Sequence, residues 1–82
     1  MAKFREYDRV RVHMLSGPAE SHLAFNESIR PPKVGDVGTV VGLRHANDGS
    51  EHFIVENVLP NGDTVWLAEF SMDELRYVEP GT

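Results

Sequence analysis

The feature that most constrains this chain is a series of short apolar runs, rich in β-branched residues and closed by turn-forming residues. Residues 8–14, DRVRVHM, alternate strictly between apolar and polar or basic side chains. That period of two predicts a half-buried strand. Its apolar face holds Val10, Val12 and Met14, and its polar face holds Arg9, Arg11 and His13. Further runs occupy residues 33–43, 52–59, 64–70 and 76–80, so the sequence predicts five short strands.

Two turn signals predict that consecutive strands form hairpins. Residues 46–51, ANDGSE, separate the second run from the third. Asn61-Gly62 separates the third from the fourth, and this pair is the strongest short hairpin signal. We expect a two-residue type I′ turn there, or a slightly longer loop that includes Pro60 and Asp63.

Two segments between the strands have helical character. Residues 16–33 lack a strand pattern, and Pro18 can begin a helix of one or two turns there. Ser71, followed three residues later by Glu74, resembles a capping box and predicts a single helical or 3₁₀ turn. The order of elements predicts an all-β fold class, a small five-stranded SH3-like barrel with a long first loop and one helical turn before the last strand. Barrel closure would remove the exposed edges of so short a sheet.

Three glycines, Gly35, Gly38 and Gly42, punctuate the second run, KVGDVGTVVGL. A phosphate-binding P-loop needs a lysine after its glycines and then a helix. Here Lys33 precedes the glycines, Asp36 lies among them and a strand follows. We therefore interpret the glycines as structural, with Gly35 in a turn beside Asp36. Gly38 would permit an unusual backbone angle or a close approach, and Gly42 would allow a kink where strands cross.

The composition fits one domain that spans residues 1–82. Cysteine is absent, which excludes a disulfide framework, a thiolate nucleophile and a cysteine-ligated metal. No apolar run is long enough to span a membrane, and the start MAKFREYDRVRV lacks the apolar segment of a signal peptide. We therefore expect a cytoplasmic, bacterial-type protein. The net charge of −5, from 13 acidic and 8 basic residues, argues against nucleic-acid binding.

Three segments of the chain resemble a known group of domains. YDRVRV, VGDVGTVVG and TVWLAEFSMDELRYVEP are together similar to the SH3-like barrel at the end of the nitrile hydratase beta subunit. They are equally similar to electron-transport accessory proteins, such as the variable chain of ferredoxin–thioredoxin reductase. They also resemble small bacterial stand-alone domains with a Gly-Asp-x-Gly-Thr-Val motif. The resemblance covers residues 7–15 and 34–79 and leaves out the loop at 16–33.

This resemblance implies a non-catalytic barrel that packs against another protein. In nitrile hydratase the metal ligands belong to the other subunit, so the resemblance implies no metal site in this chain. The pattern differs at one position, because these families usually have glycine before Asp-Arg-Val and this chain has Tyr7.

No combination of residues predicts catalysis or a cofactor. The four histidines are His13, His22, His45 and His52. His45 and His52 flank one hairpin loop, but a zinc site needs three or four ligands, so we interpret the histidines as surface or rim residues. Glu69, Asp73 and Glu74 could do acid–base work, yet Glu74 is explained as a helix cap and Glu69 as an outward strand residue. No serine lies in a nucleophile elbow. We expect no enzyme activity, no metal and no cofactor.

Trp66 is the only tryptophan, and two interpretations of it stay open. Its ring could fill the core of so small a barrel, or it could lie at a binding surface, where tryptophan is enriched. Our hypothesis is that the loop at 16–33 folds over the barrel near this ring and forms the partner-binding surface with it. The rival interpretation is that the loop's apolar residues only complete the core. The candidate partner-binding residues are Tyr7, His22, Leu23, Phe25, Ile29 and Trp66.

The favoured functional hypothesis is a non-catalytic protein-binding accessory or regulatory module, with immunity or antitoxin-like and enzyme-accessory roles as specific versions. Its partner would be basic or apolar at the contact surface. The alternative is an RNA- or ribosome-associated barrel, because GDVGTV also resembles the KOW motif. In that alternative the basic residues that line one face are Arg5, Arg9, Arg11, Arg30 and Lys33. A small enzyme is the third and weakest hypothesis.

Overall fold

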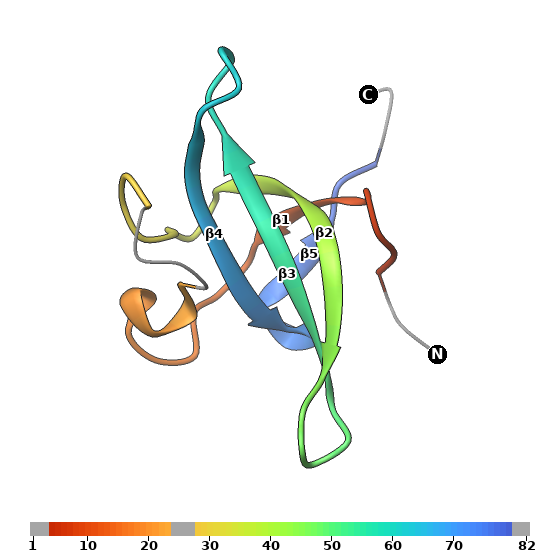
Figure 1. The fold of residues 1–82 in the computed structure, drawn as a ribbon. Helices are drawn as coiled ribbons and strands as arrows, with labels where there is room; N and C mark the ends of the chain where they lie inside the picture. The colour runs from red at the N-terminus through yellow and green to blue at the C-terminus, as the bar shows by residue number, and fades with distance from the viewer. Residues whose placement is uncertain (1–3, 24–27, 80–82) are drawn as a thin grey trace.

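The computed structural model describes residues 4–23 and 28–79 and shows one antiparallel sheet (Figure 1). Its strands are β1 (Arg9–Val12), β2 (Val37–His45), β3 (Glu51–Val58), β4 (Thr64–Ser71) and β5 (Leu75–Tyr77). The 3₁₀ turns are η1 (Ala19–His22) and η2 (Met72–Glu74). The all-β prediction, with a long first loop and one helical turn before the last strand, is confirmed. Within the described residues, no helix has the length and apolar character needed to cross a membrane.

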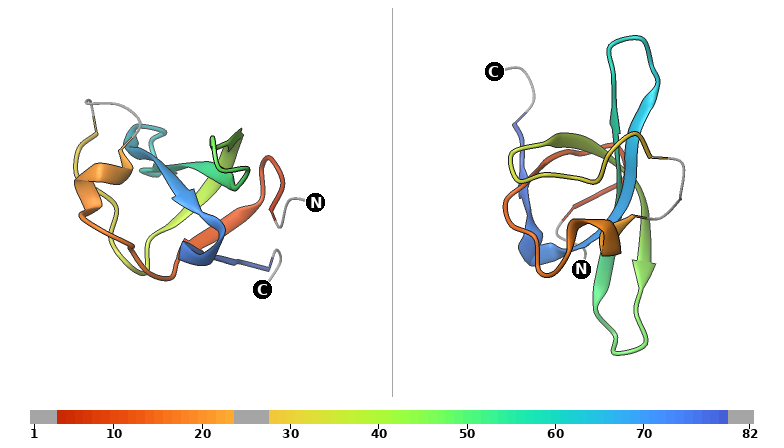
Figure 2. Two further views of the ribbon diagram at one scale, coloured as in Figure 1. Left: turned by 90° about the horizontal axis from the view of Figure 1, so that it is seen from below. Right: turned by 90° about the vertical axis from the view of Figure 1, so that its left-hand side faces the viewer.

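The sheet is open, which corrects the prediction of a closed barrel. The strand order is β4-β3-β2-β1-β5, and within the described residues no ladder joins β4 to β5. Only η2 connects these two edge strands, so the sheet curls strongly (Figure 2). Closure fails for two physical reasons. β5 has only three residues, and the long loop occupies the free edge of β4.

The long loop covers the edge of β4 with its own backbone. Leu23 forms an isolated antiparallel bridge with Ala68, and the Ile29 N–H donates to the Val65 carbonyl at 2.7 Å. Free strand edges leave backbone groups without partners, so these contacts satisfy part of the β4 edge. Pro18 lies just before η1, close to its predicted place.

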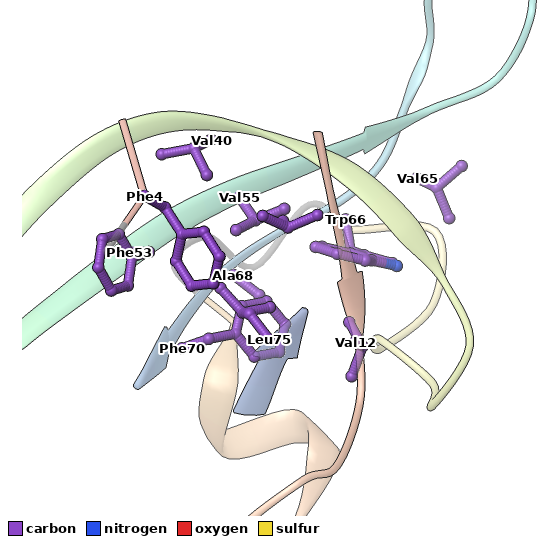
Figure 3. Packing of buried hydrophobic residues seen from close by; sticks show 11 residues of the cluster. Phe4, Val12, Val40, Phe53, Val55, Val65, Trp66, Ala68, Phe70 and Leu75 are labelled. Carbon is purple, nitrogen blue, oxygen red and sulfur yellow. The ribbon is translucent and has the colours of Figure 1, made fainter. Parts of the chain in front are cut away.

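The core lies on the concave side of the sheet and contains residues from all five strands (Figure 3). Its buried hydrophobic residues are Phe4, Val10, Val12, Val40, Phe53, Val55, Val65, Trp66, Ala68, Phe70 and Leu75. Phe4 was missed by the sequence interpretation, and its ring packs edge-on against Phe53 with centroids 5.1 Å apart. Met14 was predicted to share the inner face but is 43% exposed. β1 ends before it, because the N–H groups of His13 and Met14 both donate to the Glu74 carbonyl.

The β3–β4 hairpin has the longer of the two predicted loops. A type I′ turn needs positive φ at both central residues. Only Gly62 has it, at 95°. The Gly62 N–H donates to the Leu59 carbonyl and the Leu59 N–H to the Asp63 carbonyl, both at 2.8 Å. Pro60 therefore lies inside the loop, and the two-residue type I′ version of the prediction is wrong.

Two of the three glycines in and before β2, Gly35 and Gly38, occupy positions that a larger residue would not fit without strain. Gly35 has a φ of 97°, in a turn where the Asp36 N–H donates to the Lys33 carbonyl. Gly38 has an ordinary φ, but a Cβ there would lie 2.7 Å from the Glu56 carbonyl oxygen, so its role is close approach. The register of β2 against β3 shifts between Val40 and Gly42, so the ladder is irregular beside the third glycine.

Candidate functional site

Trp66 is a core residue, so the interpretation that placed its ring on the binding surface is wrong. Its exposed fraction is 0%. Its indole N–H donates to Asp36 Oδ2 at 2.9 Å, which satisfies the only polar atom of the ring. The same carboxylate accepts from the Arg30 guanidinium at 2.7 Å and from the Lys33 backbone N–H at 3.0 Å. Burial raises the pKa of Asp36, but these hydrogen bonds outweigh it and hold the pKa below its usual range.

His22 was predicted on the partner-binding surface and is instead buried, with its ring against the Glu74 carboxylate. Its Nε2 lies 2.5 Å from Glu74 Oε2, and its Nδ1 lies 3.0 Å from the Pro18 carbonyl. Glu74 reaches this position because it caps η2 as predicted, accepting from the Ser71 N–H at 2.9 Å. It also accepts from the Ser16 N–H at 2.9 Å.

Glu74 keeps its charge although its side chain is almost fully covered. Burial raises the pKa of this carboxyl. The hydrogen bonds from the backbone N–H groups of Ser16 and Ser71 and from the His22 ring lower the pKa by more than burial raises it. The net pKa lies below the usual range of a glutamate. This cluster therefore fastens the long loop to η2 by buried, charge-assisted hydrogen bonds.

A polar hollow of about 320 Å³ lies beside this cluster. A second pair lines it, in which His52 Nδ1 lies 2.6 Å from Glu69 Oε2. Arg44 Nε donates to the other Glu69 oxygen at 2.9 Å. The Ser21 hydroxyl in the wall donates to the Pro18 carbonyl at 2.6 Å, so its proton is not directed at a base. Among the described residues, no group of three or more histidine or acidic side chains is arranged to hold a metal ion.

Tyr7 combines an uncommon backbone conformation with high exposure. In the turn of residues 5–8, the Asp8 N–H donates to the Arg5 carbonyl at 3.1 Å, and the Arg5 N–H donates to Asp8 Oδ2 at 2.9 Å. The Tyr7 N–H donates to the Val40 carbonyl at 2.6 Å, which fixes the turn to β2. Its φ is 74°, which bulky residues rarely adopt, and 74% of the residue is exposed. It is the only non-glycine residue with positive φ in the described part of the chain.

The side chains around this turn are of types that interfaces use. Tyr77 is 49% exposed and lines a shallow hollow of about 600 Å³ with Arg5, Glu6 and Asp8. Tyrosine and arginine are both enriched in protein interfaces. Tyr77 was absent from the predicted binding set. Its position opposite Val10 in the β1–β5 ladder depends on strand pairing that the sequence alone did not give.

The structure brings Leu23 and Ile29 to β4, the strand of Trp66, and places Tyr7 elsewhere. Leu23 is half-buried against the core, whereas Ile29 is exposed. Phe25 lies outside the described residues. Tyr7 lies against β2 and Leu23 against β4, and β3 separates those two strands. The described part of the long loop does lie along β4 beside Trp66, but the ring is buried and so cannot form a binding surface with it.

The members of the proposed basic face differ in their partners. Arg30 forms an ion pair with Asp36, and within the described residues no ion pair includes Arg9 or Arg11.

Comparisons with known proteins found no matching family model, no similar curated protein and no similar solved structure. The functional inference therefore rests on the geometry of the chain itself.

Proposed function

We propose that the protein is a non-catalytic protein-binding module, in an accessory or regulatory role, that contacts its partner through Tyr7 and the surface beside it. The observation that supports this most is the positive φ of Tyr7 together with the exposure of its ring. Residues held in sparsely populated backbone regions concentrate at functional positions, where the surrounding structure maintains them.

The energetics explain why an exposed tyrosine at this position needs a functional reason. A left-handed conformation costs an ordinary residue about 1–2 kcal/mol, and glycine avoids that cost. The Tyr7 ring buries little surface in the free protein, so folding gains little from it. A partner that covers the ring would supply the missing burial. A rigid ring with a hydroxyl at its tip suits a binding contact.

The rest of the chain supports a binding role more than a catalytic one. In the polar hollow, the acceptors of Glu69 and Glu74 are taken by protein donors. General acid–base catalysis needs a group within reach of a substrate proton. These carboxylates instead fasten elements of the fold to one another.

The test is the substitution Tyr7→Gly in the full chain. The substitution relieves the backbone strain at this position, but glycine also makes the unfolded chain more flexible, which offsets part of the gain. The net effect should stabilise the fold by about 0.5–1 kcal/mol. That corresponds to a rise in Tm of roughly 2–8 °C. Capture of the partner protein should fall in the same variant, because the contact ring is gone.

Met72→Ala is the matched control, because Met72 is also an exposed apolar residue but lies in η2. Proteins captured by the wild type and by Met72→Ala, but lost with Tyr7→Gly, are the specific partners. Their identity then separates an immunity-like role from an enzyme-accessory role. Equal capture by Tyr7→Gly and the wild type would refute the proposal.

A further inference from the structure

Three arginine side chains gather on the outer face of β1 and β5. Arg11 pairs directly with Arg76 in the antiparallel ladder, and the Val78 N–H donates to the Arg9 carbonyl at 2.9 Å. Side chains alternate between the faces of a strand. Because Val10, Val12 and Leu75 are buried in the core, Arg9, Arg11 and Arg76 project from the opposite face. We call these three residues the arginine face.

Among the carboxylates that the structure describes, none neutralises the arginine face. Within residues 4–23 and 28–79, Arg30 and Arg44 have ion pairs, whereas no ion pair includes a member of the arginine face. In the described part of the chain, the only side-chain hydrogen bond made by these three arginines runs from Arg76 to the Leu75 carbonyl, at 3.5 Å. Like charges directly opposite in a ladder are unfavourable. The chain has 13 acidic residues and a net charge of −5, so carboxylates outnumber the basic residues that they could pair with. A group of arginines without such a partner therefore points to an anion from outside the chain.

The surroundings of the arginine face leave it accessible to an extended ligand. On the β2 side, Arg11 pairs with Val37 and Arg9 pairs with Thr39. Neither neighbour carries a charge, so a guanidinium row borders an apolar and hydroxyl-bearing row. All three arginines are exposed.

We propose that the arginine face binds an extended acidic segment of the partner protein. The inference rests on the proposed protein-binding function and names the chemistry of one contact. Arg9 and Arg11 are two positions apart on a strand, which places them about 6.8 Å apart along it. Acidic residues at alternate positions of an extended peptide repeat at the same spacing. Each guanidinium can then hold one carboxylate with two parallel hydrogen bonds.

A nucleic acid fits these observations less well than an acidic peptide. Its affinity comes from neutralising phosphates along the strand. Three guanidiniums on a chain of net charge −5 neutralise few of them. A short acidic segment needs to contact only the arginine face. The proposed acidic segment differs from the basic or apolar contact surface that the sequence led us to expect on the partner.

The experiment measures fluorescence anisotropy of labelled probes with the full chain. The first probe is a peptide of about eight alternating Glu and Thr residues, long enough to follow a strand. The second has Gln in place of Glu, and the third is a single-stranded oligouridine of similar length. The Glu peptide should bind at low salt and weaken as salt is raised, and the Gln peptide should not bind.

Arg11→Ala should weaken Glu-peptide binding about tenfold. Lys33→Ala is the charge-matched control, because Lys33 is an exposed cation outside the arginine face, and it should leave the affinity unchanged. A thermal melt checks that Arg11→Ala is folded, and Arg9→Ala is the second variant if it is not. No binding of the Glu peptide at low salt would overturn the proposal, as would equal losses in Arg11→Ala and Lys33→Ala.

Tighter binding of the oligouridine than of the Glu peptide, lost in Arg11→Ala, would also overturn the proposal in favour of nucleic acid. The outcome for Tyr7 is separate. If the Glu peptide fails but partner capture still depends on Tyr7, the protein-binding function stands and only the acidic segment is wrong. If the peptide binds but capture does not depend on Tyr7, the arginine face stands and the proposed contact at Tyr7 is wrong.

Discussion

Replacing Gly38 by alanine tests how closely β2 approaches β3. A Cβ at this position would lie 2.6 Å from Val55 Cγ1 and 2.7 Å from the Glu56 carbonyl oxygen. Ordinary contacts of such an atom are 3.4–4 Å. The Val55 methyl can turn aside only within a core where that residue is fully buried, and the carbonyl oxygen belongs to the β3 backbone. The two strands must therefore separate locally by about 0.7–0.8 Å to bring these two distances up to 3.4 Å.

The free energy of unfolding should fall by about 1–2 kcal/mol. Overpacking of this kind costs about 1–3 kcal/mol. Alanine also restricts the unfolded chain more than glycine does, which returns about 0.4–1 kcal/mol. Gly38→Val adds two further carbons at the same place and should lose more. For a domain of this size, the alanine variant should melt roughly 5–15 °C below the wild type.

Thermal and urea unfolding of Gly38→Ala and Gly42→Ala measures whether a Cβ at position 38 lowers the free energy of unfolding. A Cβ at Gly42 would lie 3.6 Å from Ile54 Cδ1, an ordinary contact, and the φ of Gly42 is not positive. Gly42→Ala should therefore be neutral or slightly stabilising. A Gly38→Ala protein as stable as the wild type, or no less stable than Gly42→Ala, would show that β2 and β3 can accommodate a Cβ at this position without loss of stability.

Two further predictions concern the buried polar contacts. The pKa values of Asp36, Glu69 and Glu74 are all lowered in the folded protein. The stability that these carboxylates contribute should therefore be complete above the unfolded pKa of about 4 and lost as the pH falls through the lower folded values. Urea unfolding across this pH range should show the free energy of unfolding falling in acid, and it should fall less steeply in Glu74→Gln than in the wild type. A free energy of unfolding that rises in acid would contradict the lowered pKa values. Trp66→Phe removes the hydrogen bond to Asp36 and leaves a void, so unfolding free energy should drop by about 2–3 kcal/mol. A loss of partner capture without a loss of stability would instead place the ring on the surface.

Local patterns predicted the elements of this fold well. The alternation of Val10 and Val12 located β1, and the spacing of Ser71 and Glu74 located η2. These features depend on residues close together in the chain, where the period of side chains and the chemistry of caps decide the structure. The Asn61-Gly62 hairpin was located correctly, but its turn type was not, because Leu59 and Asp63 joined the hydrogen bonding.

Long-range pairings were beyond the sequence. Fifty-two positions separate His22 from Glu74, so nothing local shows that the two groups share a buried hydrogen bond. Trp66 lies on a strand with apolar residues on both faces, so periodicity could not choose its face. The pairing of Arg11 with Arg76 likewise depends on β5 returning to lie beside β1. The candidate surfaces are therefore products of topology, and strand order was the missing information.

The return of β5 to β1 also bears on how the molecule folds. β2, β3 and β4 are joined by tight hairpins, so their pairing requires only short loops to close. β1 completes its pairing only when a segment from the other end of the sequence arrives, and such non-local contacts slow folding. We expect a millisecond-to-second folding reaction with the β1–β5 ladder among the last contacts to form. Until it forms, the apolar row of β1 has no neighbour on one side, and that is the stage at which this chain is most exposed to misassociation.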